Sequence, residues 1–160
     1  MQSTRPLLPR PAALPALLLL CLTLCLAGTT RSRADAAGAV HHLVIHVDRS
    51  DAETMRIALG NATNTIEYYR QAGGSVAIEI VANGPGVIML IHKESPVESD
   101  LAAFHARYPY VVLSACAHSL HALEDIHGHA LPLVTGAHTV PSGAVRILEL
   151  EEQHWAYLKP

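Results

Sequence analysis

The stretch that decides the fold is "VVLSACAHSLHAL", residues 111–123. Its apolar beginning is typical of a parallel strand that is buried on both faces, and we expect a strand over residues 110–114. The chain then passes through Cys116 into a segment of helical character, from Ser119 to about residue 126, which Gly128 closes. A strand that leads directly into a helix is the building unit of an α/β domain.

The same change of pattern occurs upstream. Residues 41–47, "HHLVIHV", are apolar and β-branched and predict a buried first strand. A helix follows, because apolar residues then recur at steps of three and four along one face. Ser50 and Glu53 have the spacing of a capping box at its start, and Gly73 and Gly74 end it. The residues on its predicted buried face are Met55, Ala58, Leu59, Ala62, Ile66 and Tyr69.

The middle of the chain continues the alternation. Residues 75–82, "SVAIEIVA", predict a second strand that runs into a tight turn at residues 83–86. Residues 87–93 fit either a strand or a short buried helix, since periodicity does not separate the two in so short a run. Residues 95–108 predict a helix, with Pro96 in its first turn.

The last third predicts a short strand over 138–143, a helix over 143–154 and a final strand in "WAYLKP", residues 155–160. Strands and helices therefore alternate throughout. We expect a single α/β domain with a mostly parallel sheet of about five strands and helices on both faces. In such sheets the functional groups lie at the carboxyl ends of the strands.

The amino terminus has the features of a secretory signal. Arg5 and Arg10 precede an apolar run over residues 12–27, which is shorter than the roughly 20 residues that span a membrane. Small residues follow at Ala34 and Ala36. We predict a signal peptide over 1–36 and a domain over 37–160, a periplasmic or secreted location, and no membrane attachment after cleavage. Without cleavage, the run would act as an anchor.

Net charge and histidine content limit the classes of partner that we expect. Removal of residues 1–36 takes away four of 11 Lys and Arg residues and one of 14 Asp and Glu residues, which leaves a net charge near −6. Such a surface repels phosphate backbones, so we do not expect nucleic acid as a partner. All 11 histidines remain, which makes the net charge sensitive to pH between about 5 and 8.

Cys116 is the one cysteine left after removal of the signal. It has no CxxC partner, which argues against a dithiol oxidoreductase, and it cannot form an internal disulfide. If it begins a helix, the free amides there favour a thiolate, and His118 or His121 could exchange a proton with it. Free cysteine is also often buried as a small hydrophobic residue, and spacing alone leaves both interpretations open.

Two further sites are weaker predictions. Cys116 with His118, His121, His127 and His129 would suit zinc or copper(I), but the spacing matches no ligand signature, so we predict neither a metal nor another cofactor. The turn that contains Asn83, Gly84 and Gly86 could bind an anion with its backbone amides. It lacks the glycine spacing and the lysine of a phosphate loop, so the sequence favours a plain tight turn over an anion site.

Several segments, in this order, resemble the DsrE/DsrF-like family of small α/β proteins: "ALGNATN" (58–64), "IVANGPGVIML" (80–90), "SACAHSL" (114–120) and "VPSGAVRILELEEQHWAYLKP" (140–160). The resemblance covers nearly all of residues 41–160. It implies a compact sheet and helix sandwich, assembly as a trimer or hexamer, and a single cysteine that carries a persulfide. Cys116 matches that cysteine, although residues 117–119 are Ala-His-Ser where the family often has Gly-Asn-Thr.

The first hypothesis is therefore an exported sulfur carrier or sulfurtransferase. Cys116 would carry the persulfide, His118 would exchange protons, and Asn83, Gly84 and Gly86 would shape the binding site. The partner would be a sulfur donor or acceptor protein or a small thiol. The alternatives are a non-catalytic periplasmic oligomer that binds a metal or small thiol through cysteine and histidine, and an assembly subunit with an inert cysteine.

Overall fold

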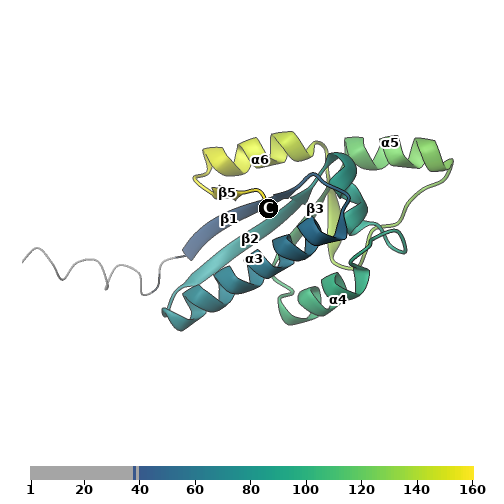
Figure 1. The fold of residues 1–160 in the computed structure, drawn as a ribbon. Coiled ribbons are helices and arrows are strands. Elements are labelled where there is room, and N and C mark those ends of the chain that lie inside the picture. Colours follow the sequence, from purple (N-terminus) through teal and green to yellow (C-terminus); the bar gives the residue numbers. More distant parts are fainter. Residues whose placement is uncertain (1–37, 39) are drawn as a thin grey trace, which may run out of the picture. The chain divides into compact units, whose positions relative to one another are not determined.

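The computed structural model describes residue 38 and residues 40–160. The predicted signal over 1–36 lies outside the described residues. The described chain contains five parallel strands in the order β4-β3-β2-β1-β5 (Figure 1). Their bounds are β1 Val40–Val47, β2 Ser75–Ala82, β3 Val112–Cys116, β4 Ala137–Val140 and β5 Ala156–Leu158. The expected parallel α/β architecture is confirmed.

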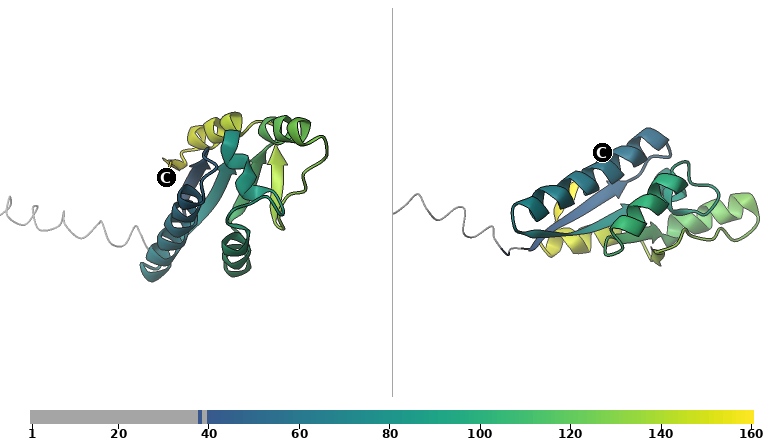
Figure 2. Two further views of the ribbon diagram at one scale, coloured as in Figure 1. Left: turned by 45° about the vertical axis from the view of Figure 1, so that its right-hand side comes forward. Right: turned by 90° about the horizontal axis from the view of Figure 1, so that it is seen from below.

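The helices lie on both sides of this sheet. Their bounds are α3 Ala52–Gln71, the 3-10 helix η1 Gly84–Leu90, α4 Glu98–Arg107, α5 Ala117–His127 and α6 Gly143–Glu152. Figures 1 and 2 show α3 and α4 on one side of the sheet and α6 on the other. The larger apolar core lies on the α3 side, whereas a small cluster of four buried residues joins α6 to the sheet, namely Val44, Val81, Ile147 and Leu150.

Helix α3 shows how the sequence pattern becomes packing. Five of the six residues predicted on its inner face are buried, and Tyr69 packs against the same core while remaining partly exposed. The cap differs from the prediction: Asp51 is the N-cap and accepts a 2.9 Å hydrogen bond from the backbone N–H of Thr54. The proposed capping box of Ser50 and Glu53 was therefore one residue out of register with the helix start.

The segment after β2 is the main correction to the predicted elements. Residues 83–86 are not an isolated tight turn, because Asn83 caps η1 and the chain stays helical to Leu90. This result also decides the ambiguity over residues 87–93. Ile91 then forms an isolated antiparallel bridge with Leu133. A Cβ on Gly86 would clash with the backbone of Val47, so only glycine allows η1 to pass this close to β1.

The remaining boundaries shift by a few residues. Strand β3 begins at Val112 and reaches Cys116, and α5 starts at Ala117, two residues before the predicted start. Helix α5 ends as expected at Gly128, which has φ +72°. Helix α4 starts at Glu98, so Pro96 precedes its first turn. Within residues 38 and 40–160, no helix is both long and apolar enough to cross a membrane.

Candidate functional site

Parallel pairing brings the ends of three strands together. Val47 of β1 pairs with Ala82 of β2, and Ala82 pairs with Ala115 of β3. The next residues, Asn83 and Cys116, therefore lie at the same edge of the sheet. This is the edge at which parallel α/β proteins place their functional groups.

Cys116 ends β3 and is also the N-cap of α5. It is a free cysteine with 4% of its surface exposed. Its side chain makes no capping hydrogen bond to α5. The sulfur nevertheless lies where the unpaired amides of a helix start favour negative charge.

The surroundings of the sulfur lower the pKa of Cys116. Burial is the largest single influence and raises the pKa, because it disfavours the thiolate. The Ser119 hydroxyl and the backbone N–H groups of Gly143, Ser119 and His118 together outweigh burial. Two of these amides begin α5 and one begins α6, so two helix starts converge on one sulfur.

Gly143 makes this convergence possible. A Cβ at this position would come within 2.8 Å of the Asn83 Cβ and 3.2 Å of the Cys116 Cβ. Ser142 caps α6 and accepts from the backbone N–H of Val145, which starts the helix directly at Gly143. Glycine therefore allows the first amide of α6 to approach Cys116.

Asn83 is held in place by a histidine and a tyrosine. His46 Nε2 lies 2.8 Å from Asn83 Oδ1, and His46 Nδ1 lies 2.7 Å from the Tyr157 hydroxyl. Because Oδ1 accepts, Nε2 carries the proton, and in the neutral ring Nδ1 accepts from Tyr157. Both ring nitrogens of His46 are therefore used in hydrogen bonds within the chain. This pairing leaves the Asn83 amide nitrogen on the side of Gly143.

The amides of the predicted anion-binding turn already have partners within the chain. Gly84 N–H donates to Ser119 Oγ at 2.7 Å, and Gly86 N–H donates to the Asn83 carbonyl at 2.9 Å. In this structure they therefore shape the site by joining η1 to α5 and by tightening the turn. Their role in binding stays a prediction.

The two histidines nearest to Cys116 lie on the surface. His118 contributes its backbone N–H to the surroundings of the sulfur, and its exposed side chain lies at the edge of a cavity of about 490 Å³ between η1 and α5. His121 is exposed on α5. Proton exchange by the His118 side chain stays a prediction. Among residues 38 and 40–160, no three Cys, His, Asp or Glu side chains are grouped so that they could hold a metal ion.

A buried ion pair attaches α6 to the sheet close to the site. Glu79 of β2 is 1% exposed, and its carboxylate accepts from Arg146 of α6 at 2.9 and 2.7 Å and from the Ser114 hydroxyl at 2.6 Å. Burial raises the pKa of Glu79, but these hydrogen bonds outweigh it and the pKa is lowered. Helix α6 is thus tied to β2 three residues after the amide that faces Cys116.

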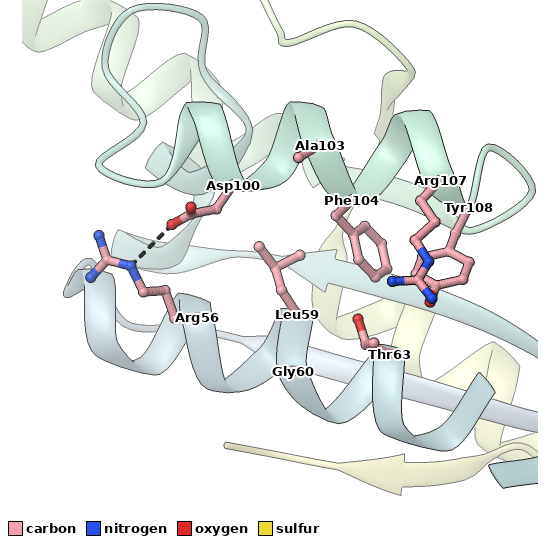
Figure 3. Close-up of a pocket in the computed structure, with 9 residues that line it drawn as sticks. All are labelled: Arg56, Leu59, Gly60, Thr63, Asp100, Ala103, Phe104, Arg107 and Tyr108. Atoms are coloured by element: carbon pink, nitrogen blue, oxygen red, sulfur yellow. Dashed lines mark hydrogen bonds and ion pairs between the residues drawn. The ribbon is translucent and has the colours of Figure 1, made fainter. Parts of the chain in front are cut away.

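A second cavity, of about 410 Å³, lies between α3 and α4 (Figure 3). Figure 3 shows Arg56 and Asp100 facing each other across it, with a 3.0 Å ion pair. Arg107 pairs with Glu67 at 2.9 Å. The lining residues include no cysteine or histidine, and the charges near the cavity are paired, so we assign it to the packing of the two helices.

Sequence reasoning found Cys116 and the turn at Asn83 but missed Ser119, Gly143 and Tyr157. The pair Ser142-Gly143 has the form of a helix cap, which is a local signal that was available. Nothing local connects Tyr157 with His46, since 111 residues separate them.

Comparison with known proteins supports the fold. The solved structure of a protein of unknown function, MTH1491 from Methanobacterium thermoautotrophicum, is similar to this chain with a TM-score of 0.64 and 27% sequence identity. The match covers 75% of this chain and 99% of that chain. No family model and no curated protein matches the sequence.

Proposed function

We propose that this protein is a sulfur carrier or sulfurtransferase in which Cys116 accepts sulfane sulfur as a persulfide and passes it on. One observation carries the proposal: two helix starts and the Ser119 hydroxyl converge on a single thiol and lower its pKa. A thiolate is the nucleophile in sulfur transfer, and it needs such donors when it is largely buried.

The transfer itself requires no redox partner. The Cys116 thiolate attacks a sulfane sulfur of the donor, a new S–S bond forms, and the donor's S–S bond breaks with its electron pair leaving on the donor. A second thiolate then attacks the outer sulfur of the Cys116 persulfide and regenerates Cys116. The amides of Ser119 and Gly143 stabilise the anionic sulfur in the first and last states. We propose that His118, at the solvent edge, exchanges the proton.

The direct test is the mass of the intact protein after incubation with inorganic polysulfide. We expect a gain of one sulfur atom that dithiothreitol removes and that peptide mapping places at Cys116. Cys116→Ser should show no such gain. An unmodified Cys116 after exposure to excess polysulfide, in protein that is folded, would contradict the proposal.

The oligomeric state and the location of the protein are also part of the proposal. The resemblance to the DsrE/DsrF-like family supports sulfur transfer within a homo-oligomer, either a trimer or a hexamer. The amino-terminal sequence features support export to the periplasm or beyond. Amino-terminal sequencing of the protein from its host membrane and periplasmic fractions tests export, since a chain that begins at Ala37 is expected.

A further inference from the structure

The cavity between η1 and α5 is next to the proposed nucleophile but plays no part in the steps above. It has a volume of about 490 Å³. Its apolar lining includes Pro85 and Ile88 from η1 and Ala122, Leu123 and Ile126 from α5. Ile126 is 80% exposed and extends the apolar lining to the surface of α5.

Ser119 connects this cavity to the sulfur. Its side chain belongs to the cavity lining, accepts from Gly84 N–H at 2.7 Å, and also favours the Cys116 thiolate. Cys116 is not itself part of the lining. The polar end of the cavity, formed by Gly84, His118 and Ser119, is the end nearer to it, because Ser119 is in the first turn after Cys116 and Gly84 follows Asn83, which lies beside Cys116. A ligand with its sulfur at Cys116 would extend its other end over the apolar residues.

We propose that this cavity binds the organic substituent of the sulfur donor, and that the donor is a low-molecular-weight organic persulfide, R–S–SH, with an apolar R group. The inference rests on the proposed function and names its substrate class. No Asp, Glu, Lys or Arg side chain lines the cavity, so beyond His118 at its polar end it offers no charged group to thiosulfate or to a thiol that carries carboxylates. Its volume is within the range of cavities that hold small molecules.

The reaction with such a donor is balanced. The Cys116 thiolate attacks the outer sulfur of R–S–SH and forms the S–S bond of Cys–S–SH. The S–S bond of the donor breaks, and R–S⁻ leaves with its electron pair. The proton on the transferred sulfur stays there or is lost to water. No oxidant or reductant is consumed, and the leaving R group remains in the apolar cavity until release.

The experiment measures Cys116 modification by a series of alkyl methanethiosulfonates, from methyl to pentyl. Each reagent gives Cys–S–S–R and methanesulfinate, and peptide mass mapping locates the adduct at Cys116. Rates are divided by those of free N-acetylcysteine, which removes differences in intrinsic reactivity. We expect the normalised rate to rise with chain length, by up to about fourfold per methylene that the cavity buries.

Two substitutions one residue apart on α5 provide the comparison. Ala122→Trp fills the cavity and should remove the dependence on chain length. His121→Trp adds the same side chain at an exposed position outside the cavity and should preserve the dependence on chain length. Ile126→Glu is a second variant, which should weaken the dependence by placing a charge at the apolar end. Circular dichroism confirms that each variant is folded.

The outcomes separate this inference from the proposed function. A normalised rate that is flat across the series in the unmodified protein, or that rises equally in Ala122→Trp, overturns the cavity assignment. If that protein still takes up sulfur from inorganic polysulfide, the carrier function stands without it. If Cys116 reacts with neither polysulfide nor any alkyl reagent, both proposals fail.

Discussion

At the scale of single residues, the reactivity of Cys116 depends on a few donor groups that lie close to its sulfur. The Ser119 hydroxyl and the amide of Gly143 come from different helices, and both must lie close to the sulfur to outweigh burial. Small changes at either position should therefore alter the thiol more than they alter the fold.

Removal of the Ser119 hydroxyl should raise the pKa of Cys116, because the thiolate loses its strongest single donor. The alkylation rate of Cys116 by iodoacetamide, measured against pH, should then inflect at a higher pH in Ser119→Ala. At pH 7 we expect a rate about tenfold lower, since a hydrogen bond to a charged group contributes about 1.5 kcal/mol. Ser99→Ala, at an exposed position of α4, is the control. Identical pH profiles for the two variants would contradict the role of Ser119.

Gly143→Ala should disturb the site at the point where α6 approaches it. The added Cβ would overlap with Asn83 and press on Cys116, so we expect a loss of about 1–3 kcal/mol in stability and slower alkylation of Cys116. Gly60→Ala is the matched control, because a Cβ there meets nothing within 4 Å. Urea unfolding and alkylation kinetics measure the two effects. Equal behaviour of the two variants would show that the contact at Gly143 is unimportant.

At the scale of elements, α6 is held by a buried ion pair as well as by a small apolar cluster. Its partner strand β2 supplies Glu79, and β3 supplies Ser114, so one carboxylate joins three elements. The same helix presents Gly143 to the sulfur, which makes its position on the sheet relevant to the pKa of Cys116.

Arg146→Met should be strongly destabilising, because it leaves the Glu79 carboxylate buried without its cation. We expect a loss of about 3–5 kcal/mol in the free energy of unfolding. Arg56→Met is the control: it breaks the exposed pair with Asp100 and should cost no more than about 1 kcal/mol. Chemical denaturation measures both. If Arg146→Met is no more destabilising than Arg56→Met, α6 is held mainly by its apolar contacts.

At the scale of the whole molecule, the two sides of the sheet are unequal. The α3 side has the large core, whereas the α6 side has a cluster of four buried apolar residues. Val145 and Leu148 of α6 are 52% and 55% exposed and lie one turn apart. We propose this side of the molecule as the contact between copies of the chain.

Leu148→Glu should therefore dissociate the proposed trimer or hexamer, because it places a charge in an apolar contact. Light scattering coupled to size exclusion should give the mass of several subunits for the unmodified protein and a smaller mass for the variant. Ile57→Glu, at a 45% exposed position on α3, should leave the mass unchanged. A monomeric unmodified protein at micromolar concentration would contradict the proposal.

The sequence by itself determined the α/β class, the buried face of α3 and the position of Cys116 between a strand and a helix. These features follow from periodicity and from residues close in the chain. It did not determine the cap at Asp51 or the 3-10 helix after Asn83, since several local conformations fit those residues equally.

Only the tertiary structure decided what surrounds the sulfur. The register of the parallel strands brings Asn83 beside Cys116, and the crossover through β4 returns the chain so that α6 begins there. Glu79 and Arg146 are 67 residues apart and meet for the same reason. Such contacts depend on how strands pair and on which side each helix crosses the sheet, and neither leaves a pattern in a local stretch of sequence.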